Sequence, residues 1–432
     1  MSQEQSRANF FRQSGWMIIA NTVSGFFMAA VHPFASAMPP GEYSVFFTLL
    51  RVFTIFAIPA AGLQTIMAQQ AAASSARNQE GTLAATLRQV LIATSVLWLL
   101  LVLITAFYHS TIVQKFQIAN PMVLWVTLLT ILLALWMPIF QGVLQGRENF
   151  LWLGWSMIFN GVGRVVAIIL IVWGLKGQAT GAMTGAMCGV ASAILIAFWP
   201  SRTMLHEKGD PVQINQWLGK TIWLICGIAP GLLLVNLDMI VIQSYFSREV
   251  TPYYAAGAMI GYALVTFTTP IAAVMFPKIV KSVVGAQKTD ALFLAVLGTG
   301  ILGGVGAIFC TFFPELPLRI IFFKNPDYIK AAPLVPWFIW AFVPLTMANV
   351  LISNLLARER FAAIPLLALI GIAYPFALFS YMPIGVKLPA FVAFERIVQI
   401  LGFFSLALFT IALLFTLYDK RMTQLPKTES ES

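Results

Sequence analysis

The chain has 432 residues, of which 59% are hydrophobic and only 10% are charged, and its mean hydropathy is +0.85. Soluble domains of this length need far more charged surface, so the composition excludes them and indicates a polytopic membrane protein. The net charge of +10 does not indicate a nucleic-acid-binding protein, because Lys and Arg stand singly at the ends of apolar runs and not in clusters interleaved with aromatics.

Twelve apolar runs follow one another along the chain, joined by short connections. A helix needs roughly 20 apolar residues to cross the hydrocarbon core of a bilayer, so these runs predict an all-α integral membrane protein with twelve transmembrane helices. The predicted spans cover residues 14–34, 43–67, 87–108, 121–145, 150–173, 180–200, 217–244, 253–276, 291–313, 333–357, 361–383 and 392–418.

The first run admits a second interpretation. Arg7 and Arg12 precede it and Ala35–Ala37 follow it, as in a cleavable signal peptide. The run is long for such a peptide, however, and it contains Asn21 and His32. Cleavage would also leave an odd number of spans, so we expect the run to be retained as the first span.

Spans four and five are joined by the charged turn LQGRENF (Leu144–Phe150), which is nearly repeated as LLARERF (Leu355–Phe361) between spans ten and eleven. A shift of 211 positions relates the two turns, and the same shift superposes Tyr43 on Tyr254. Short hairpin turns often carry Arg and Glu, but this does not explain a constant shift. We therefore predict an internal duplication.

The duplication divides the chain into two six-helix bundles, residues 1–205 and 217–432, joined by a cytoplasmic linker at 206–216. Each bundle has an even number of spans, so both enter the membrane from the same side. Parallel repeats of this kind are related by a pseudo-two-fold axis along the membrane normal, with the substrate path between them.

Lys and Arg are distributed unequally between the two sides of the predicted membrane. Sixteen of them lie at span ends on the side of the termini. The opposite side holds seven: Lys115, Lys176, Arg248, Arg319, Lys324, Lys330 and Lys387. Cytoplasmic loops carry an excess of positive charge, so we expect both termini in the cytoplasm.

Five charged residues fall inside predicted spans: Arg51, Arg164, Asp238, Glu395 and Arg396. Placing a charge in the membrane costs roughly 2.5–3.5 kcal/mol on insertion scales, so each of these residues needs a functional or structural explanation. We predict that all five bind substrate in one cavity, where three guanidiniums outnumber two carboxylates and hold phosphate by bidentate, charge-assisted hydrogen bonds. The alternative is that these residues pair with one another, snorkel or, in the case of Asp238, bond a neighbouring helix.

Two residues are candidates for energy coupling. His32 and Asp238 both lie in the outer third of the first span of their half, where a titrating pair could couple transport to a proton gradient, with a sodium gradient as the alternative. A single His beside Pro33 is also typical of an interfacial polar residue. The chain has no GxxxxGK[ST] motif, which argues against direct use of ATP. We predict no metal site, cofactor or catalytic residue, since the Cys and His residues are dispersed.

Glycine and proline mark places where helices pack or bend. Four glycines stand four residues apart in GQATGAMTGAMCG and predict close helix packing, with sliding of that face during transport as the second interpretation. Pro59 and Pro270, at matching places in each half, predict kinks. Tryptophans fit interface anchoring better than a sugar platform: Trp16, Trp152, Trp155 and Trp173.

Several stretches resemble a known family: QGVLQGRENFLWLGWSMIFNGVGR, NLDMIVIQSYFSREVTPYYAAGAMIGY, MFPKIV and GQATGAMTGAMCG. Through them nearly the whole chain resembles the polysaccharide-transporter branch of the multidrug/oligosaccharidyl-lipid/polysaccharide exporter superfamily. The resemblance implies two six-helix bundles forming a V around a central cavity that opens alternately to each side. It also implies a flippase of the bacterial inner membrane for undecaprenyl-diphosphate-linked oligosaccharides in surface polysaccharide (O-antigen, lipopolysaccharide or exopolysaccharide) biosynthesis, with polymerases and glycosyltransferases as partners.

Three other functions remain as alternatives. A cation-coupled multidrug exporter of the same superfamily needs carboxylates in its cavity, and the first span contains no Asp or Glu. A major-facilitator transporter usually has a Gly/Asp/Arg-rich loop between spans two and three, which AQQAAASSARNQEGT lacks. A membrane-embedded polysaccharide polymerase or ligase needs catalytic groups in a sizeable outer loop, and PELPLRIIFFKNPDYIKAAP contains no His. We therefore expect a transporter that is not an enzyme.

Overall fold

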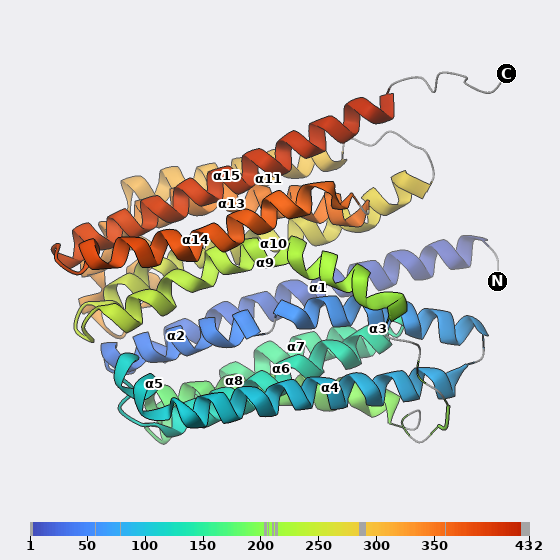
Figure 1. The fold of residues 1–432 in the computed structure, drawn as a ribbon, viewed down its shortest axis with the longest axis horizontal. Coiled ribbons are helices and arrows are strands. Elements are labelled where there is room, and N and C mark those ends of the chain that lie inside the picture. Colours follow the sequence, from blue (N-terminus) through green and yellow to red (C-terminus); the bar gives the residue numbers. More distant parts are fainter. Residues whose placement is uncertain are drawn as a thin grey trace.

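The fold is described from a computed structural model of the chain. The structure describes residues 3–424 except 57, 78, 203–204, 206, 210, 212–214, 285–290 and 359. Long helices run side by side along one direction, and the described residues contain no β-strand (Figure 1). The all-α class predicted from the sequence is therefore confirmed.

The helices follow the predicted spans in order. In the N-terminal half they are α1 (Gln3–Ala35), α2 (Pro40–Phe56), α3 (Ile58–Arg77), α4 (Glu80–Phe107), α5 (His109–Lys115), α6 (Met122–Gly146), α7 (Phe150–Ile168), the π-helical η1 (Ile169–Gly174), α8 (Gln178–Phe198) and η2 (Trp199–Ser201). In the C-terminal half they are α9 (Asn215–Tyr245), α10 (Thr251–Val284), α11 (Ala291–Phe312), α12 (Glu315–Ile321), η4 (Pro326–Ala331), α13 (Leu334–Ala357), η5 (Phe361–Ala363), α14 (Ile364–Gly385) and α15 (Ala390–Gln424).

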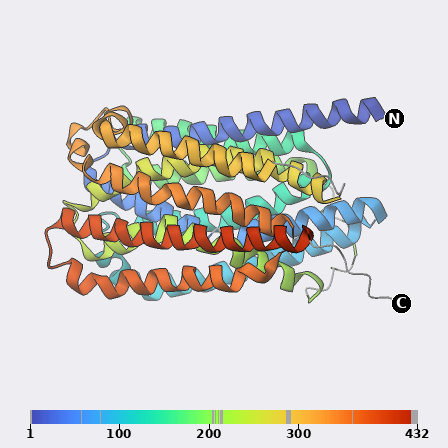
Figure 2. The same ribbon diagram turned by 90° about the horizontal axis from the view of Figure 1, so that it is seen from above.

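Within the described part of the chain, ten helices are long and apolar enough to cross a membrane. α2 and α3 bend by 40° at their junction and together make an eleventh span, and the bend lies beside Pro59, as predicted. α10, with 34 residues, runs between the same two ends of the molecule (Figures 1 and 2). By length and composition the described residues thus give up to eleven spans, which is roughly consistent with the twelve predicted.

The two halves form bundles with the same pattern of helix contacts. α1 packs on α7 and α3 on α6 in the first bundle, as α9 packs on α14 and α10 on α13 in the second. Helix ends repeat as well: α2 begins at Pro40 and α10 at Thr251, while α6 ends at Gly146 and α13 at Ala357. Both pairs differ by the shift of 211 found in the sequence. Such a repeat is what an internal duplication produces.

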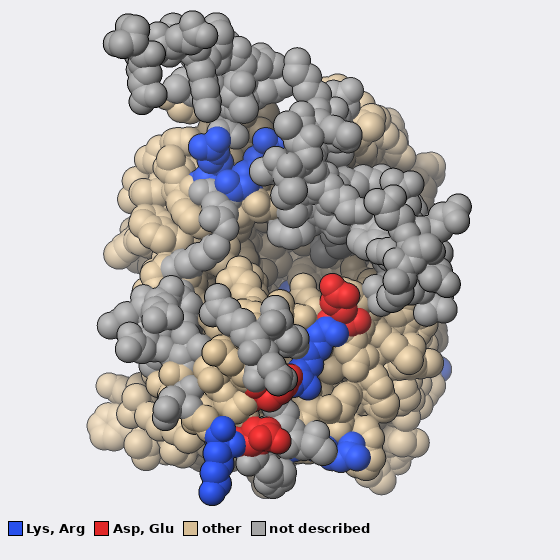
Figure 3. All heavy atoms as spheres, turned by 90° about the vertical axis from the view of Figure 1, so that its right-hand side faces the viewer, with Lys and Arg blue, Asp and Glu red and all other residues tan. Residues whose placement is uncertain are grey.

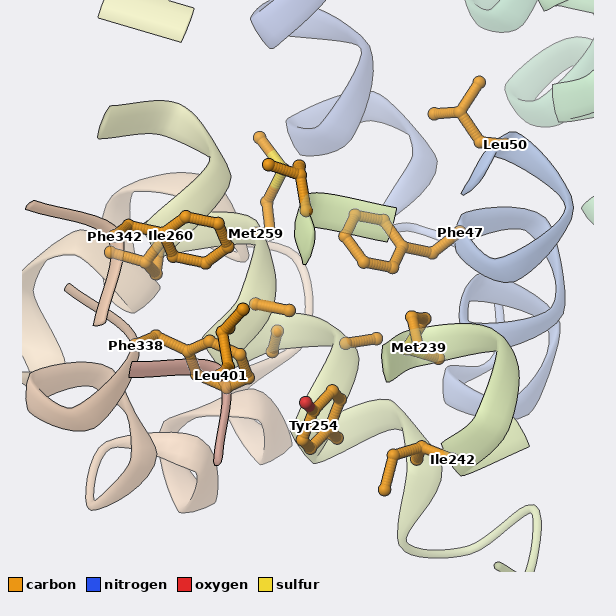
Figure 4. Packing of buried hydrophobic residues seen from close by; sticks show 14 of the residues in the cluster. Phe47, Leu50, Met239, Ile242, Tyr254, Met259, Ile260, Phe338, Phe342 and Leu401 are labelled. Atoms are coloured by element: carbon orange, nitrogen blue, oxygen red, sulfur yellow. The ribbon is translucent and has the colours of Figure 1, made fainter. Parts of the chain in front are cut away.

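The bundles meet along a few helices, a contact that we call the seam. α2 and α3 contact α9, and α1 and α2 contact α10. In Figure 1 most of the C-terminal helices lie above the N-terminal ones, with the seam helices between them. Buried apolar side chains fill part of the seam: Phe47 of α2 points toward the helices that carry Met239 and Met259 (Figure 4).

Glycines bring α7 and α8 close together beside the seam, as their spacing predicts. A Cβ added at Gly189 would collide with the carbonyl oxygen of Asn160 on α7, and it would lie 2.8 Å from Cβ of Arg164. Only hydrogen at this position lets the backbones approach so closely. The glycine face of α8 thus fixes the position of Arg164.

The short helices α5 and α12 were not predicted, because a stretch of seven residues is too short to be recognised by its apolar length. Glu359 of the second charged turn and much of the linker 206–216 lie outside the described residues. α10 continues unbroken through Pro270.

Candidate functional site

Two ends of the molecule give the site its orientation. The terminal end carries both chain termini, and the distal end is the opposite one, where α1 is joined to α2 and α9 to α10 (Figure 1). The charged residues predicted to bind substrate are distributed between the middle of the seam and the distal end.

Arg51 of α2 lies in the seam and is only 2% exposed. Its guanidinium carbon lies 4.1 Å from the ring centroid of Phe47 and 4.0 Å from that of Tyr262 on α10. Nη1 donates a 3.4 Å hydrogen bond to the side-chain oxygen of Asn236 on α9, and Nη2 is buried with no partner among the described residues. Both bundles therefore hold this cation.

Arg164 of α7 lies in the same region and is 3% exposed. Its guanidinium carbon is 6.0 Å from the ring centroid of Phe53 on α2, and its Nε is buried without a partner among the described residues. His32 and Tyr262 are within electrostatic range of both Arg164 and Arg51. The structure therefore brings together the two arginines that the sequence placed on separate spans of the N-terminal half.

Neither guanidinium has a carboxylate as a direct partner. The ion pairs between described residues join other groups, and Asp238 of α9, which lies within electrostatic range of Arg51, accepts a 2.6 Å hydrogen bond from the hydroxyl of Tyr254 instead. Removing a cation from water costs several kcal/mol unless a counter-charge compensates it. The middle of the seam is consequently short of negative charge.

His32 and Asp238 have the same kind of partner. Nδ1 of His32 lies 3.0 Å from the hydroxyl of Tyr43, just as Asp238 binds Tyr254. The two tyrosines are the pair related by the 211-residue shift, but their partners are not equivalent, since the same shift places Gln243 at the position of His32 and Phe27 at that of Asp238. His32 and Asp238 thus occupy two separate tyrosine-bonded sites, and their role in energy coupling stays a prediction.

Glu395 and Arg396 lie apart from this group, in the first turns of α15 at the distal end. Arg396 is exposed and donates a 2.9 Å hydrogen bond to Gln399 on its own helix, and Glu395 is half-buried. The structure therefore places Glu395 and Arg396 apart from Arg51, Arg164 and Asp238 in this conformation, and their role in substrate binding stays a prediction. Counting residues from a span end gives depth but not direction, and the buried face of α15 is formed by neighbours such as Phe394 and Ile397.

Polar contacts between the bundles close the distal end, and we call them the distal lock. Arg248, before α10, forms an ion pair with Glu42 of α2, whose second oxygen accepts a 3.2 Å hydrogen bond from the Ala179 N–H. Gln117 and Gln243 each donate to a backbone carbonyl of the opposite half, over 2.6 and 3.0 Å. Between described residues, the hydrogen bonds that join the halves all lie at Arg51 or on its distal side.

The terminal end has a different surface. Figure 3 shows Lys, Arg, Asp and Glu side chains there, on a face that is hollowed near its centre. This conformation is thus closed at the distal end, and the described part of the terminal face is recessed (Figure 3). Arg51 and Arg164 are nevertheless covered, so the central cavity that the family resemblance implies is not open around them in this conformation. Phe47 and Tyr262 close on Arg51 from the two halves.

Several residues of the site were not found from the sequence. Tyr262 could have been, because the shift of 211 places it opposite Arg51 on the equivalent helix. Residues at equivalent positions of a pseudo-two-fold repeat meet when they lie near the axis. Glu42 lies just outside the predicted span 43–67, where a charge requires no explanation, and its pairing with Arg248 depends on a contact between halves.

Comparisons with known proteins give the relationships of the chain. The family model described as "Polysaccharide biosynthesis protein" matches residues 11–283, and no curated protein matches the sequence significantly. Among solved structures, an inward-facing multidrug resistance MATE family transporter of the MOP superfamily has a TM-score of 0.73 and 12% identity, with 96% of this chain and 100% of that chain covered.

Two further structures extend this similarity. An outward-facing MATE family transporter of the same superfamily has a TM-score of 0.61 and 14% identity, over 97% of this chain and 96% of that one. The lipid II flippase MurJ in its inward closed conformation has a TM-score of 0.67 and 13% identity, over 95% and 94%. These proteins share the fold, and the family model covers more than half of the chain. The chain therefore belongs to the polysaccharide biosynthesis protein family and has the fold of the MOP superfamily transporters.

Proposed function

We propose that the protein is a flippase that moves an anionic, undecaprenyl-diphosphate-linked oligosaccharide across the bacterial inner membrane for surface polysaccharide biosynthesis. Its family supports the pathway, and the flippase MurJ has the same fold. One observation carries the proposal: the guanidiniums of Arg51 in the seam and of Arg164 beside it are buried, and neither forms an ion pair with a described residue. A diphosphate between the halves would supply the missing negative charge and accept charge-assisted hydrogen bonds.

Alternating access follows from the seam. In the proposed orientation the terminal end faces the cytoplasm, because most Lys and Arg gather there, and the distal lock holds the outer side closed. The headgroup enters from the cytoplasmic side while the lipid tail stays in the bilayer. Binding to Arg51 draws the guanidinium away from Tyr262, and opening of the distal lock then releases the headgroup outside.

The proposal includes a source of energy for transport and partner enzymes of the same pathway. His32 and Asp238 are the candidate groups for coupling to a proton or sodium gradient, since each is buried and bonded to a tyrosine hydroxyl. Glycosyltransferases would build the substrate on the cytoplasmic side, and a polymerase would use it outside. The protein itself moves its substrate without changing covalent bonds, so we assign it no catalytic residue.

The test reconstitutes the purified protein in liposomes with a fluorescent undecaprenyl-diphosphate oligosaccharide. A membrane-impermeant quencher measures the fraction in each leaflet over time, and chromatography measures the glycan length. We expect movement between leaflets at constant length, and movement that is lost in Arg51→Met and Arg164→Met. A change in glycan length would point to the polymerase alternative. Ethidium efflux without lipid movement would favour the multidrug exporter, whose fold is the same.

A further inference from the structure

A cavity at the distal end lies apart from Arg51 and Arg164. It has a volume of about 460 Å³ and is lined by the turn between α1 and α2, the end of η1, the start of α8 and the loop after α12. This size is within the range of roughly 300–1,000 Å³ that small-molecule sites have. Because the loop after α12 belongs to the other half, the cavity is complete only while the halves are together at this end.

The cavity is cationic, with one ammonium group from each half. Lys176 and Lys324 both line it, and none of the lining residues is Asp or Glu. Neither lysine forms an ion pair with a described residue. Glu42, which accepts a hydrogen bond next to this wall, is already occupied by Arg248. The two lysines are therefore available to an anion.

An indole forms a further wall. Trp173 is anchored by a 3.0 Å hydrogen bond from its Nε1 to the Phe34 carbonyl and by ring contact with Phe34 at 5.3 Å. It stays 39% exposed, and Lys324 Nζ lies 5.0 Å from its ring centroid. The sequence favoured interface anchoring for Trp173, but a fixed, half-exposed indole beside a cation also offers an apolar face to a sugar ring while the ammonium binds a charged substituent.

The backbone around the cavity is unusual in the same place. Trp173 lies in the π-helical η1, a type of helix that is frequent at functional sites. Lys176 and Gln178 follow with φ angles of +54° and +47°, two of the four positive values among non-glycine residues in the described chain. Residues held in this region persist where surrounding structure fixes them, often at ligand sites. The turn that presents Lys176 is thus built in a conformation that free chain avoids.

From these observations we propose that the cavity is a second substrate subsite, which binds an anionic group carried beside a pyranose ring on the outer side of the membrane. That the ligand is an exported saccharide rests on the proposed function, whereas its negative charge rests on the two lysines. A ligand that contacts Lys176 and Lys324 together binds only the form closed at the distal end and therefore favours that form. The subsite would then help the transporter to close after release.

The experiment measures binding by calorimetry to the full-length protein in nanodiscs. Three probes are compared: a tetrasaccharide that contains glucuronate, N-acetylglucosamine 1-phosphate, and the neutral tetrasaccharide of N-acetylglucosamine. We expect the anionic probes to bind, more weakly at high salt, and to lose about tenfold in affinity in Lys176→Gln and in Lys324→Gln. Lys387→Gln, an exposed lysine elsewhere at the distal end, is the control and should bind as the parent does.

The probes also identify the source of the charge. Tighter binding of the glucuronate tetrasaccharide assigns it to the glycan, and tighter binding of the sugar phosphate assigns it to the linkage with the lipid. Equal binding of the neutral probe, or affinities that neither lysine variant changes, would overturn the proposal. Binding is scored without transport, so lysine-dependent binding in a protein that moves no lipid would reject the proposed function and leave the subsite standing.

Discussion

Replacing Arg51 with Met separates a functional role of the seam cation from a structural one. The change keeps a long apolar side chain between Phe47 and Tyr262 and removes the charge. In the closed conformation, Arg51 gains about 2 kcal/mol from each desolvated cation–π contact. Its hydrogen bond to Asn236, at 3.4 Å, contributes no more than about 1.5 kcal/mol. These gains are similar to the several kcal/mol that burying the guanidinium costs.

We therefore expect Arg51→Met to change the free energy of unfolding by less than about 2 kcal/mol, in either direction. Substrate binding should fall by about ten- to a hundredfold, since a charge-assisted contact with a diphosphate contributes about 1.5–3 kcal/mol. Thermal unfolding in detergent and lipid movement in liposomes measure the two effects. Arg319→Met, which removes an exposed arginine at the distal end, is the matched control. Unchanged transport by a stable Arg51→Met protein would refute a role for this cation in binding.

The other predictions concern groups around the seam. Tyr262→Phe keeps the ring that Arg51 contacts and should transport normally. Tyr262→Ala removes the ring and should weaken the closed form by about 2 kcal/mol, measured by unfolding. Equal effects of the two variants would contradict the ring contact. Arg248→Gln should destabilise the closed distal lock by about 1 kcal/mol, because its ion pair with Glu42 is partly exposed. Cysteines introduced at the distal seam should then be labelled more. Unaltered labelling would argue against a lock. Gly189→Ala should displace Arg164, reduce transport by at least about tenfold and lower stability by about 1–3 kcal/mol. The control is Gly298→Ala, which has open space around it and should behave as the parent does in both assays.

The fold could be predicted from the sequence because the lipid environment allows the backbone few structures. Every backbone polar group in the hydrocarbon core must be satisfied within a helix, so an apolar run of sufficient length specifies a helix and its approximate bounds. The 211-residue shift predicted a repeat, and helix ends in the two halves differ by the same shift. α5 and α12 were not predicted, because the length of an apolar run does not specify short helices at a membrane surface.

The site was harder to predict than the fold, since depth in the membrane can be counted but direction cannot. Arg51 and Arg396 looked alike in the sequence, each a single arginine within a span. α2 packs on both α9 and α10, which turns Arg51 into the seam, whereas Arg396 lies on the exposed face of α15. Only the contacts between helices determine whether such an arginine faces the seam or the exposed surface, and these contacts cannot be inferred from a single sequence.

The predicted duplication also bears on the mechanism that we propose for the seam. Two identical halves would place the same residue on both sides of the axis, and two facing arginines would repel each other. Here one copy of the position is Arg51 and the other is Tyr262, so the pair attracts and closes the seam on itself. A diphosphate competes for the same guanidinium with stronger hydrogen bonds than an aromatic ring can offer. In the proposed mechanism, divergence at this one pair of positions would therefore link substrate binding to separation of the bundles, which identical repeats could not do.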